Sequence, residues 1–406
     1  MSGILSGLRV IEGSAFVAAP LGGMTLAQMG ADVIRFDPIG GGLDYRRWPV
    51  TEAGDSLFWA GMNKGKRSIQ VDLSAPQGRE LLTELISAPG DNSGIFLTNF
   101  PERGWLGYDR LRALRDDLIY VNVMGDRHGG SAVDYTVNCA VGFTHSTGAE
   151  GSDEPVNHLL PAWDNITGQM AVVGLLAAER HRRLTGEGQL VKLALKDVAL
   201  ATAGHLGNIS EVVINGSDRP KYGNYLYGAF GRDFVCADGR RLMVVGLTDR
   251  QWAGIKKAMG IEAESAELAS RLALNLDLEG DRFAARKEIA ALVEPWFRQH
   301  ESDWIQDVFD ENGVCWGPYR TFKEMVEEDA DCSEENPMFK QIRQPGIGTY
   351  PAPGSPFNFS SVPRHDPTPA PLLGQHTDEV LMDELGLSSG QVAELRDEGI
   401  VAGGGN

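Results

Sequence analysis

The sequence predicts an α/β protein whose larger part is built on a parallel β-sheet. Short apolar runs alternate with helical patterns over the first ~210 residues, and the pattern changes after a Gly- and Tyr-rich connection over 221–231. Apolar residues make up 42% of the chain and charged residues 23%, as in ordinary globular proteins. Strands that alternate with helices form a parallel sheet covered on both faces. The 406 residues exceed the roughly 150 of one typical domain, so we expect at least two compact units.

The first elements form a βαβ unit. Residues 8–12 are a short apolar run that predicts a strand, and residues 32–36 return to an extended pattern. Between them, Pro20 fits the first position of a helix over 21–29, which Gly30 ends. The alternation continues through the strands 68–73, 94–99, 118–124 and 189–195 and the helices 76–86, 108–115, 164–184 and 197–209. Parallel sheets bind ligands at the carboxyl ends of their strands, so we expect a site in the loops after Glu12, Phe36, Asn99 and Met124.

The rest of the chain predicts a smaller domain and a returning C-terminal segment. Asp238 and Gly239 separate two apolar runs, as the turn of a β-hairpin does, and helical patterns follow Trp252. The proline-rich segment 345–371 has almost no periodicity, which predicts an extended linker to a short helix over 377–385. We therefore expect a large domain over 1–215, a small domain over 225–335, and a linker with a return to the large domain over 345–406.

Composition argues against several classes of function. The formal net charge of −19 repels the phosphate backbone of nucleic acids. No apolar run approaches the ~20 residues that span a bilayer, and the first residues lack a basic region followed by an apolar one, so we expect a cytoplasmic protein that does not enter membranes. The cysteines have neither a zinc spacing nor a disulfide framework, and we expect free thiols at Cys139, Cys236, Cys315 and Cys332.

Asp164 stands at the start of the amphipathic pattern that predicts a helix over 164–184. Aspartate at a helix start commonly caps the first turn by accepting backbone N–H groups. A carboxylate at the same place is also suited to nucleophilic attack on a carbonyl carbon, because it is ionised at neutral pH and held in one position. The pattern by itself leaves both roles open.

Several segments, in this order along the chain, resemble one family. They are residues 7–12, 19–21 and 26–35 in the first βαβ unit, 63–73 at the next strand, Asn99-Phe100-Pro101, the Thr-Gly-Glu-Gly-Gln turn at 185–189, and 371–377 near the end. Together they resemble the class III CoA transferases, also called the carnitine-CoA transferase and formyl-CoA transferase family, over nearly the whole chain. Asp164 falls at the position of that family's carboxylate nucleophile, so the resemblance favours a catalytic role for it.

The resemblance implies a fold, an assembly and a cofactor requirement. It implies a Rossmann-like large domain built from both chain ends, a smaller α+β domain, and a homodimer of two interlocked subunits. In such enzymes coenzyme A is part of the acyl-CoA substrate, so we expect no separate cofactor and no metal. The family's glycine loop corresponds to the residues around Gly246, whose backbone amides are expected to stabilise an oxyanion.

The resemblance also places CoA along the carboxyl ends of the sheet. Pro38 and Met124 stand where formyl-CoA transferase has an arginine and a lysine, so other basic residues are expected to bind the phosphates. The expected CoA-binding residues are Val17, Ala18, Arg46, Arg47, Lys64, Lys66, Asp72, Leu73, Asn99, Phe100, Arg103, Met124, Gly125 and Asp126.

Four longer segments, 12–24, 35–45, 133–138 and 223–231, resemble a branch of the family that moves CoA between the two carboxyl groups of one dicarboxylic acid. For that reaction we expect Asp164 to attack the thioester and to carry CoA as an aspartyl thioester while the released acid stays enclosed. The donors expected to hold the acid are Tyr135, Asn138, His145, His158 and Arg46.

Other functions stay open on the sequence. An intermolecular CoA transferase would use a separate carboxylic acid as acceptor. An α-methylacyl-CoA racemase shares the fold but has a histidine where this chain has Val133. A dinucleotide oxidoreductase has little support, since no Gly-x-Gly-x-x-Gly follows the first strand. A protein that only binds a ligand would have no need of Asp164.

Overall fold

The computed structural model describes residues 3–403, and the chain forms two compact units. The first unit consists of Met1–Val141, Leu159–Ile209 and Asp329–Asn406, and the second of Gly142–His158 and Ser210–Glu328. From the sequence we expect the large domain to run without a break over 1–215. In the structure the stretch Gly142–His158 belongs to the second unit instead, and the chain comes back to the first unit just before Asp164.

A seven-stranded sheet forms the centre of the first unit, with the strand order β12-β3-β2-β1-β4-β5-β6. The pairs among β1 to β6 are parallel, and β12 is antiparallel to β3. Without β12 the order is that of a Rossmann fold, which confirms the predicted α/β class. The strands are β1 (Arg9–Gly13), β2 (Asp32–Asp37), β3 (Arg67–Val71), β4 (Ile95–Thr98), β5 (Ile119–Met124), β6 (Gln189–Ala194) and β12 (Val401–Ala402).

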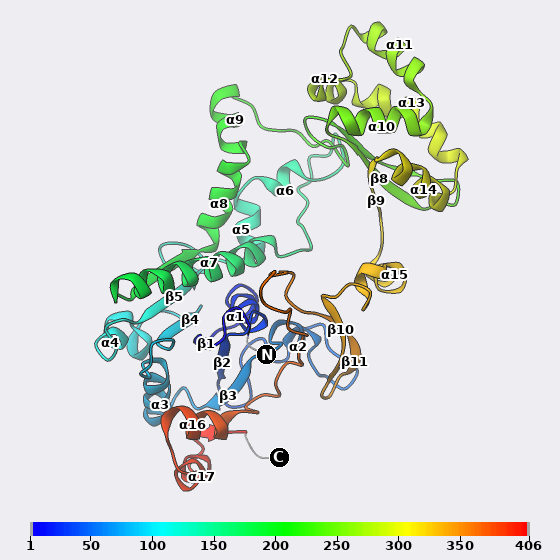
Figure 1. Cartoon of the computed structure of the whole chain (residues 1–406). Helices are drawn as coiled ribbons and strands as arrows, with labels where there is room; N and C mark the ends of the chain where they lie inside the picture. Colours follow the sequence, from blue (N-terminus) through cyan, green and yellow to red (C-terminus); the bar gives the residue numbers. More distant parts are fainter. Residues whose placement is uncertain (1–2, 404–406) are drawn as a thin grey trace. The chain divides into compact units, whose positions relative to one another are not determined.

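Helices cover the two faces of this sheet (Figure 1). Helices α1 and α7 pack on one face, and α3 and α16 pack on the other next to β3. The helices of this unit are α1 (Ala18–Gln28), α2 (Leu57–Met62), α3 (Pro76–Ile86), η1 (Gly104–Leu106), α4 (Tyr108–Arg112), α5 (Asp134–Ala140), α7 (Ala162–Thr185), α8 (Leu195–His205), η2 (Ala330–Cys332), α16 (Thr377–Leu385) and α17 (Ser389–Asp397).

The contact between α1 and α7 depends on glycine. A Cβ added to Gly168 would lie 2.7 Å from the carbonyl oxygen of Ala18, and one added to Gly22 would lie 3.2 Å from the carbonyl oxygen of Gly168. Without side chains at these positions the two helix backbones approach closely. The first turn of α7, which carries Asp164, therefore lies beside the start of α1.

The C-terminal segment returns to the sheet through hydrogen bonds to β3. The backbone amide of Gly374 donates to the Ser68 hydroxyl (3.0 Å), and the amide of Ser68 donates to His376 Nδ1 (3.1 Å). The hydroxyl of Thr377 accepts from the backbone amide of Gln70 and donates to the carbonyl of Ala402. These contacts give a structural reason for the motif at 371–377.

Residues 339–353 form an antiparallel hairpin of β10 (Phe339–Gln344) and β11 (Gly348–Pro353). The sequence pattern predicted an extended linker from residue 345. The prolines of this segment conceal the strand pattern, but a two-stranded hairpin has free edges that tolerate proline. Gly346, with a φ of 76°, supplies the left-handed conformation that the turn requires.

The second unit is α+β. Its antiparallel sheet has the order β7-β8-β9, and Asp238 and Gly239 lie in the turn between the first two strands, as expected. Phe230, Phe297 and Trp252 are fully buried in its core. Its elements are α6 (Phe143–Ser146), β7 (Phe230–Val235), β8 (Arg241–Gly246), α10 (Asp249–Met259), α11 (Glu262–Leu272), α12 (Glu279–Ala284), α13 (Arg286–Gln299), α14 (Ser302–Asn312), β9 (Cys315–Pro318) and α15 (Phe322–Glu328).

Helix α9 (Asn208–Asn215) contains the point in the sequence, between Ile209 and Ser210, at which the chain passes from the first unit to the second. Over residues 3–403, no helix combines the length and the hydropathy that a membrane span requires.

Candidate active site

Asp164 is the third residue of α7, two residues further into the helix than the sequence analysis expected. The N-cap position is Pro161, which makes no side-chain cap. Asp134 caps the helix instead: its Oδ2 accepts hydrogen bonds from the backbone amides of Trp163 (2.7 Å) and Asp164 (3.1 Å). The Asp164 carboxylate is not used to cap the helix, and it makes no hydrogen bond to any residue between 3 and 403.

Helix α5 braces the start of α7. Asp134 and Asn138, one turn apart on α5, are both buried, and Asn138 Oδ1 accepts from the indole Nε1 of Trp163 (3.1 Å). Asn138 was expected to hold substrate, and the structure gives its amide oxygen a different role, in fixing Trp163. Asp134 was not singled out from the sequence, because its partner amides lie about 30 residues further along the chain.

The environment of Asp164 raises the pKa of its carboxyl group to about 7. Partial burial is the largest cause, and the negative charge of Asp134 acts in the same direction, while the positive charge of Arg47 opposes both. A more basic carboxylate is the stronger nucleophile, and near neutral pH a substantial fraction of Asp164 is ionised. A carboxylate at this position is therefore more nucleophilic than an ordinary one and still partly ionised near neutral pH.

Arg47 supplies the positive charge at this site. Its guanidinium lies over the rings of Phe16, 5.4 Å from the centroid, and Phe58, 5.2 Å from the centroid. No carboxylate of residues 3–403 forms an ion pair with it. Phe16 has a φ of 68°, a conformation that is costly for a residue with a side chain and that recurs at functional sites. Arg47 is therefore a half-buried cation beside Asp164, held by rings and open to an anionic group.

The loop after β1 is joined to the loop after β4 at the point where the strand order of the sheet reverses. Asn99 donates from Nδ2 to the carbonyl of Ala15 (2.7 Å), and its Oδ1 accepts from the Ala15 amide (3.0 Å). This is the crevice at which doubly wound sheets bind ligands. Val17 is the N-cap residue of α1 and Ala18 its first residue. Val17, Ala18 and Asn99 thus lie at one end of the sheet, and Asp164 lies in the first turn of α7, which packs against α1.

A cavity of about 870 Å³ lies along the loops after β3 and β4. The expected CoA-binding residues Leu73, Phe100 and Arg103 line it. Arg79, Trp105 and Arg110 line it as well and were missed in the sequence. Arginine side chains combined with apolar and aromatic walls suit a nucleotide that carries phosphates. These three residues lie in α3, η1 and α4, the elements that follow β3 and β4, and that location was the signal that could have identified them.

Lys64 and Lys66, expected to bind phosphate, are both buried. Lys66 Nζ donates to Glu12 Oε1 (2.8 Å), the carbonyl of Pro20 (2.8 Å) and Asn63 Oδ1 (3.0 Å), so all three of its N–H donors are used inside the protein. Lys64 donates to the carbonyl of Gly61 (2.6 Å), and burial lowers its pKa to about 8. The structure therefore gives Lys66 a structural role in place of the expected contact with phosphate.

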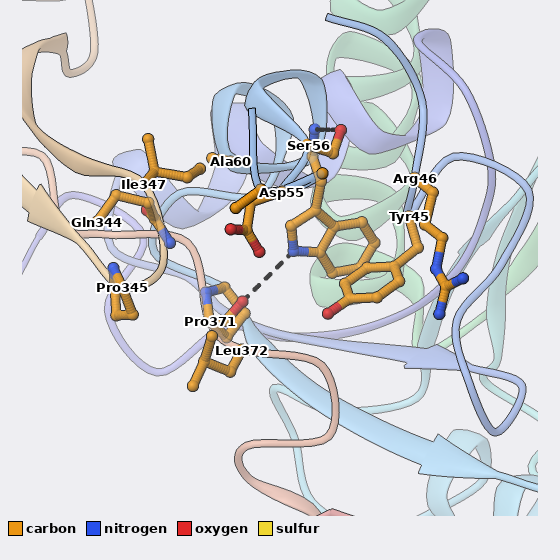
Figure 2. A pocket seen from close by; sticks show the side chains of 13 residues that line it. Tyr45, Arg46, Asp55, Ser56, Ala60, Gln344, Pro345, Ile347, Pro371 and Leu372 are labelled. Carbon is orange, nitrogen blue, oxygen red and sulfur yellow. Dashed lines mark hydrogen bonds between the residues drawn. The ribbon is translucent and has the colours of Figure 1, made fainter. Parts of the chain in front are cut away.

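Arg46 lies at the edge of a separate cavity of about 440 Å³, which Asp55, Pro371 and Leu372 also line. Figure 2 shows Arg46 beside Tyr45, with Asp55, Pro371 and Leu372 further from Arg46. Neither Asp164 nor Arg103 lines this cavity. Arg46 and Arg103, both expected to bind phosphate, thus line different cavities.

Two expected carboxylates stabilise turns. Asp72 accepts from the backbone amide and the hydroxyl of Ser74, and Asp126 accepts from the backbone amides of His128 and Gly130. These hydrogen bonds are the main reason that the pKa of each carboxyl group lies below its usual value. Met124 ends β5, Gly125 follows it, and the side chain of Tyr135 is exposed.

The remaining expected residues belong to the second unit. His145 lies in α6, and His158 is the last residue of the Gly142–His158 stretch. At the glycine loop, the backbone amides of Leu247 and Thr248 both donate to Gln251 Oε1 (3.0 Å each), which caps α10. These two amides, expected to face an oxyanion, are engaged in a helix cap in this structure.

Comparison with known proteins supports the resemblance that the sequence suggested. The sequence model of CoA-transferase family III matches residues 5–377. The chain is 64% identical to the 2-methylfumaryl-CoA isomerase of Chloroflexus aurantiacus over 404 residues, which is 99% of each chain. It is 30% identical to the succinyl-CoA--D-citramalate CoA-transferase of the same organism over 98% of each chain. A CAIB/BAIF family protein from Brucella suis has a similar crystal structure, with a TM-score of 0.75, 25% identity, and coverage of 94% of this chain and 99% of that one. The chain belongs to CoA-transferase family III.

Proposed function

We propose that the chain is a 2-methylfumaryl-CoA isomerase, an intramolecular CoA transferase that interconverts 2-methylfumaryl-CoA (mesaconyl-C1-CoA) and 3-methylfumaryl-CoA (mesaconyl-C4-CoA). The observation that carries this proposal is the 64% identity, over 99% of both chains, with the Chloroflexus aurantiacus protein of that name. The site supports it, because a carboxylate with a raised pKa lies close to an arginine that forms no ion pair within residues 3–403.

The first half of the reaction moves CoA from the acid to the enzyme. An oxygen of Asp164 attacks the thioester carbon of the substrate, the C–S bond breaks, and the thiolate leaves with the electron pair. The product is a mixed anhydride between Asp164 and the acid. The thiolate then attacks the carbonyl carbon of Asp164, the C–O bond breaks, and the acid leaves as a carboxylate. Asp164 now carries CoA as a thioester.

The second half runs these steps in reverse with the other carboxylate of the same acid. That carboxylate attacks the aspartyl thioester, and the released thiolate attacks the acid carbon of the new anhydride. Asp164 is regenerated, and no water, metal or redox cofactor takes part. The freed dicarboxylate has to stay in the site between the two halves while it presents its second carboxyl group.

Arg47 is our candidate for the group that holds the free carboxylate of the substrate. A guanidinium binds a carboxylate through two parallel hydrogen bonds, and Arg47 is placed to do so beside Asp164. At the other end of the ligand, Arg79, Arg103 and Arg110 in the 870 Å³ cavity are the candidates for the phosphates of CoA. The location that we propose is the cytoplasm. Cys139, Cys236, Cys315 and Cys332 are free thiols, which is the state that the reducing cytoplasm maintains.

We also propose that the enzyme is a homodimer with interlocked subunits. Helix α9 buries none of its residues in the single chain, although Ile209, Val212, Val213 and Ile214 lie along it. An apolar surface of this kind is usually covered by another protein surface. Light scattering coupled to size-exclusion chromatography should give the mass of two chains, and the mass of one chain would refute the dimer.

Two measurements on the purified enzyme test the proposed reaction. Incubation with 2-methylfumaryl-CoA should give 3-methylfumaryl-CoA on liquid chromatography without added mesaconate. In an acid-quenched sample, mass spectrometry should find CoA attached through a thioester to the peptide that contains Trp163 and Asp164. With a saturated α-methylacyl-CoA as substrate, exchange of its α-hydrogen with deuterated water without movement of CoA would instead identify a racemase. Product formation only after a separate acid is added would identify an intermolecular transferase.

A further inference from the structure

We propose that Arg35 and Asp44 form a buried pair that positions Arg47, and that this pair controls whether the freed dicarboxylate stays in the site between the two halves of the reaction. The inference rests on the proposed function, in which Arg47 holds the free carboxylate. Neither Arg35 nor Asp44 was singled out as a site residue from the sequence, and neither is exposed to a ligand, since their exposed fractions are 1% and 0%.

The guanidinium of Arg35 joins the segments around the start of the site. Its Nη2 donates to both carboxylate oxygens of Asp44 (2.9 and 3.1 Å) and to the carbonyl of Ser14 (3.1 Å). Its Nη1 donates to Asn63 Oδ1 (3.2 Å), and the Cζ atom of Arg35 lies 4.4 Å from the ring centroid of Trp59. One buried side chain therefore contacts the loop that leads to Phe16 and the loop that leads to Arg47.

Asp44 connects this pair to Arg47. The backbone carbonyl of Asp44 accepts a hydrogen bond from the backbone amide of Arg47 (3.2 Å), so a single turn joins the two residues. The loop between β2 and α2 that contains them has no regular secondary structure from Pro38 to Val50 other than turns and one bridge. In such a loop the hydrogen bonds from Arg35 to the Asp44 carboxylate fix the position of the backbone. The two rings that flank Arg47 then determine the direction of its guanidinium.

Asp37 provides a matched control within the same cluster. It accepts two hydrogen bonds from Arg35, each of 3.0 Å, and is as buried as Asp44. However, Asp37 is the last residue of β2 and is held by strand pairing opposite Gln70 of β3. Loss of its charge should weaken the cluster without releasing the loop that carries Arg47. The two substitutions therefore separate a positioning role from a general effect on stability.

The consequence for catalysis concerns the freed acid. After the first half of the reaction the acid is bound by no covalent bond, so its escape competes with its attack on the aspartyl thioester. A displaced Arg47 would speed escape and leave the thioester available to acid from solution. The measurable quantity is the exchange ratio, which we define as labelled mesaconate incorporated into CoA thioester per molecule isomerised.

The experiment uses the full-length enzyme with unlabelled 2-methylfumaryl-CoA and carbon-13 mesaconate in solution, followed by liquid chromatography and mass spectrometry. We expect a low exchange ratio for the wild-type enzyme and for Asp37→Asn. For Asp44→Asn we expect a rise of about tenfold or more, the effect of losing one charge-assisted contact at the site. Arg47→Gln should raise the ratio by at least as much, and Asp44→Asn should add nothing in the Arg47→Gln background, because the two act through the same group.

Each outcome supports or overturns the inference. A wild-type enzyme that does not isomerise its substrate would overturn the proposed function and this inference with it. If the wild-type enzyme isomerises, two results would overturn the inference alone. One is an equal exchange ratio for Asp44→Asn and Asp37→Asn. The other is that the effects of Asp44→Asn and Arg47→Gln on the exchange ratio are independent. Thermal unfolding checks that each variant is folded. Should Asp44→Asn not fold, Asp44→Glu keeps the charge, displaces the loop by one methylene group and carries the same expectation.

Discussion

The substitution Asp134→Asn tests how the reactivity of Asp164 is set. The amide oxygen of asparagine can still accept from the backbone amides of Trp163 and Asp164, but the negative charge is lost. Loss of a charge at a helix N-terminus costs roughly 0.3–1 kcal/mol, and replacing charge-assisted hydrogen bonds with neutral ones costs about 1 kcal/mol more. We therefore expect the free energy of unfolding to fall by about 1–2 kcal/mol.

The pH dependence of the reaction carries the decisive part of this prediction. Asp134 raises the pKa of Asp164, so its replacement should lower that pKa from about 7. In the proposed mechanism ionised Asp164 is the reactive form, so the rise of kcat/KM with pH should move to lower pH, by about half a unit or more. The maximum value of kcat/KM should also fall, because the less basic carboxylate is the weaker nucleophile. Chromatographic rates measured between about pH 5 and pH 9 would show both effects.

A matched control separates capping from chemistry. Asp238 accepts from the backbone amide (2.9 Å) and the hydroxyl (2.6 Å) of Ser302 at the start of α14 in the second unit. Asp238→Asn should therefore reduce stability as Asp134→Asn does while leaving the pH profile unchanged. A profile for Asp134→Asn that does not move, or that moves to higher pH, would refute the claim that Asp134 tunes Asp164.

Three further predictions follow from the described contacts. Asp164→Ala should keep a native thermal transition while lowering isomerase kcat by about 10⁴-fold or more, and an enzyme with near-normal kcat would exclude the covalent mechanism. Gly168→Ala places a Cβ 2.7 Å from the carbonyl oxygen of Ala18, so it should lower the free energy of unfolding by about 1–3 kcal/mol and reduce kcat. Gly174→Ala is the control, because its Cβ would contact only the side chain of Val191, at 3.2 Å, and it should change neither quantity. Burial lowers the pKa of His376, so on acidification this histidine takes up its proton at a higher pH in the unfolded chain than in the folded one. The free energy of unfolding should therefore fall as the pH drops below about 6.5. Urea titrations should show a smaller fall for His376→Asn.

The order of strands and helices along the first part of the chain could be predicted because the signals are local. The helix expected over 76–86 coincides with α3, and the strands expected over 32–36 and 189–195 match β2 and β6 to within one residue. Proline and glycine mark the ends of these elements, and their apolar runs are long enough to show a period. The short helices α2 and α5 show no such period and were missed. The hairpin of β10 and β11 was missed because its prolines suggested a linker.

Candidate site residues could be proposed from the sequence, but the state of each depends on partners far along the chain. Nothing near Lys66 in the sequence indicates that Glu12, 54 residues earlier, would bury its ammonium group. In the same way, the cap of α7 comes from Asp134 on another helix. Local patterns report which residue types are present, while burial and charge pairing are properties of the tertiary fold.

The reactivity of Asp164 illustrates why the site cannot be reduced to its nucleophile. Burial and the charge of Asp134 make its carboxylate more basic, and Arg47 partly offsets this so that the ionised form is present near neutral pH. When the free carboxylate of a substrate binds Arg47, its negative charge cancels much of that offset. Asp164 then becomes more basic at the moment when a thioester is beside it. An acid without a second carboxylate would leave Arg47 uncompensated, so in the proposed mechanism Arg47 favours dicarboxylate substrates.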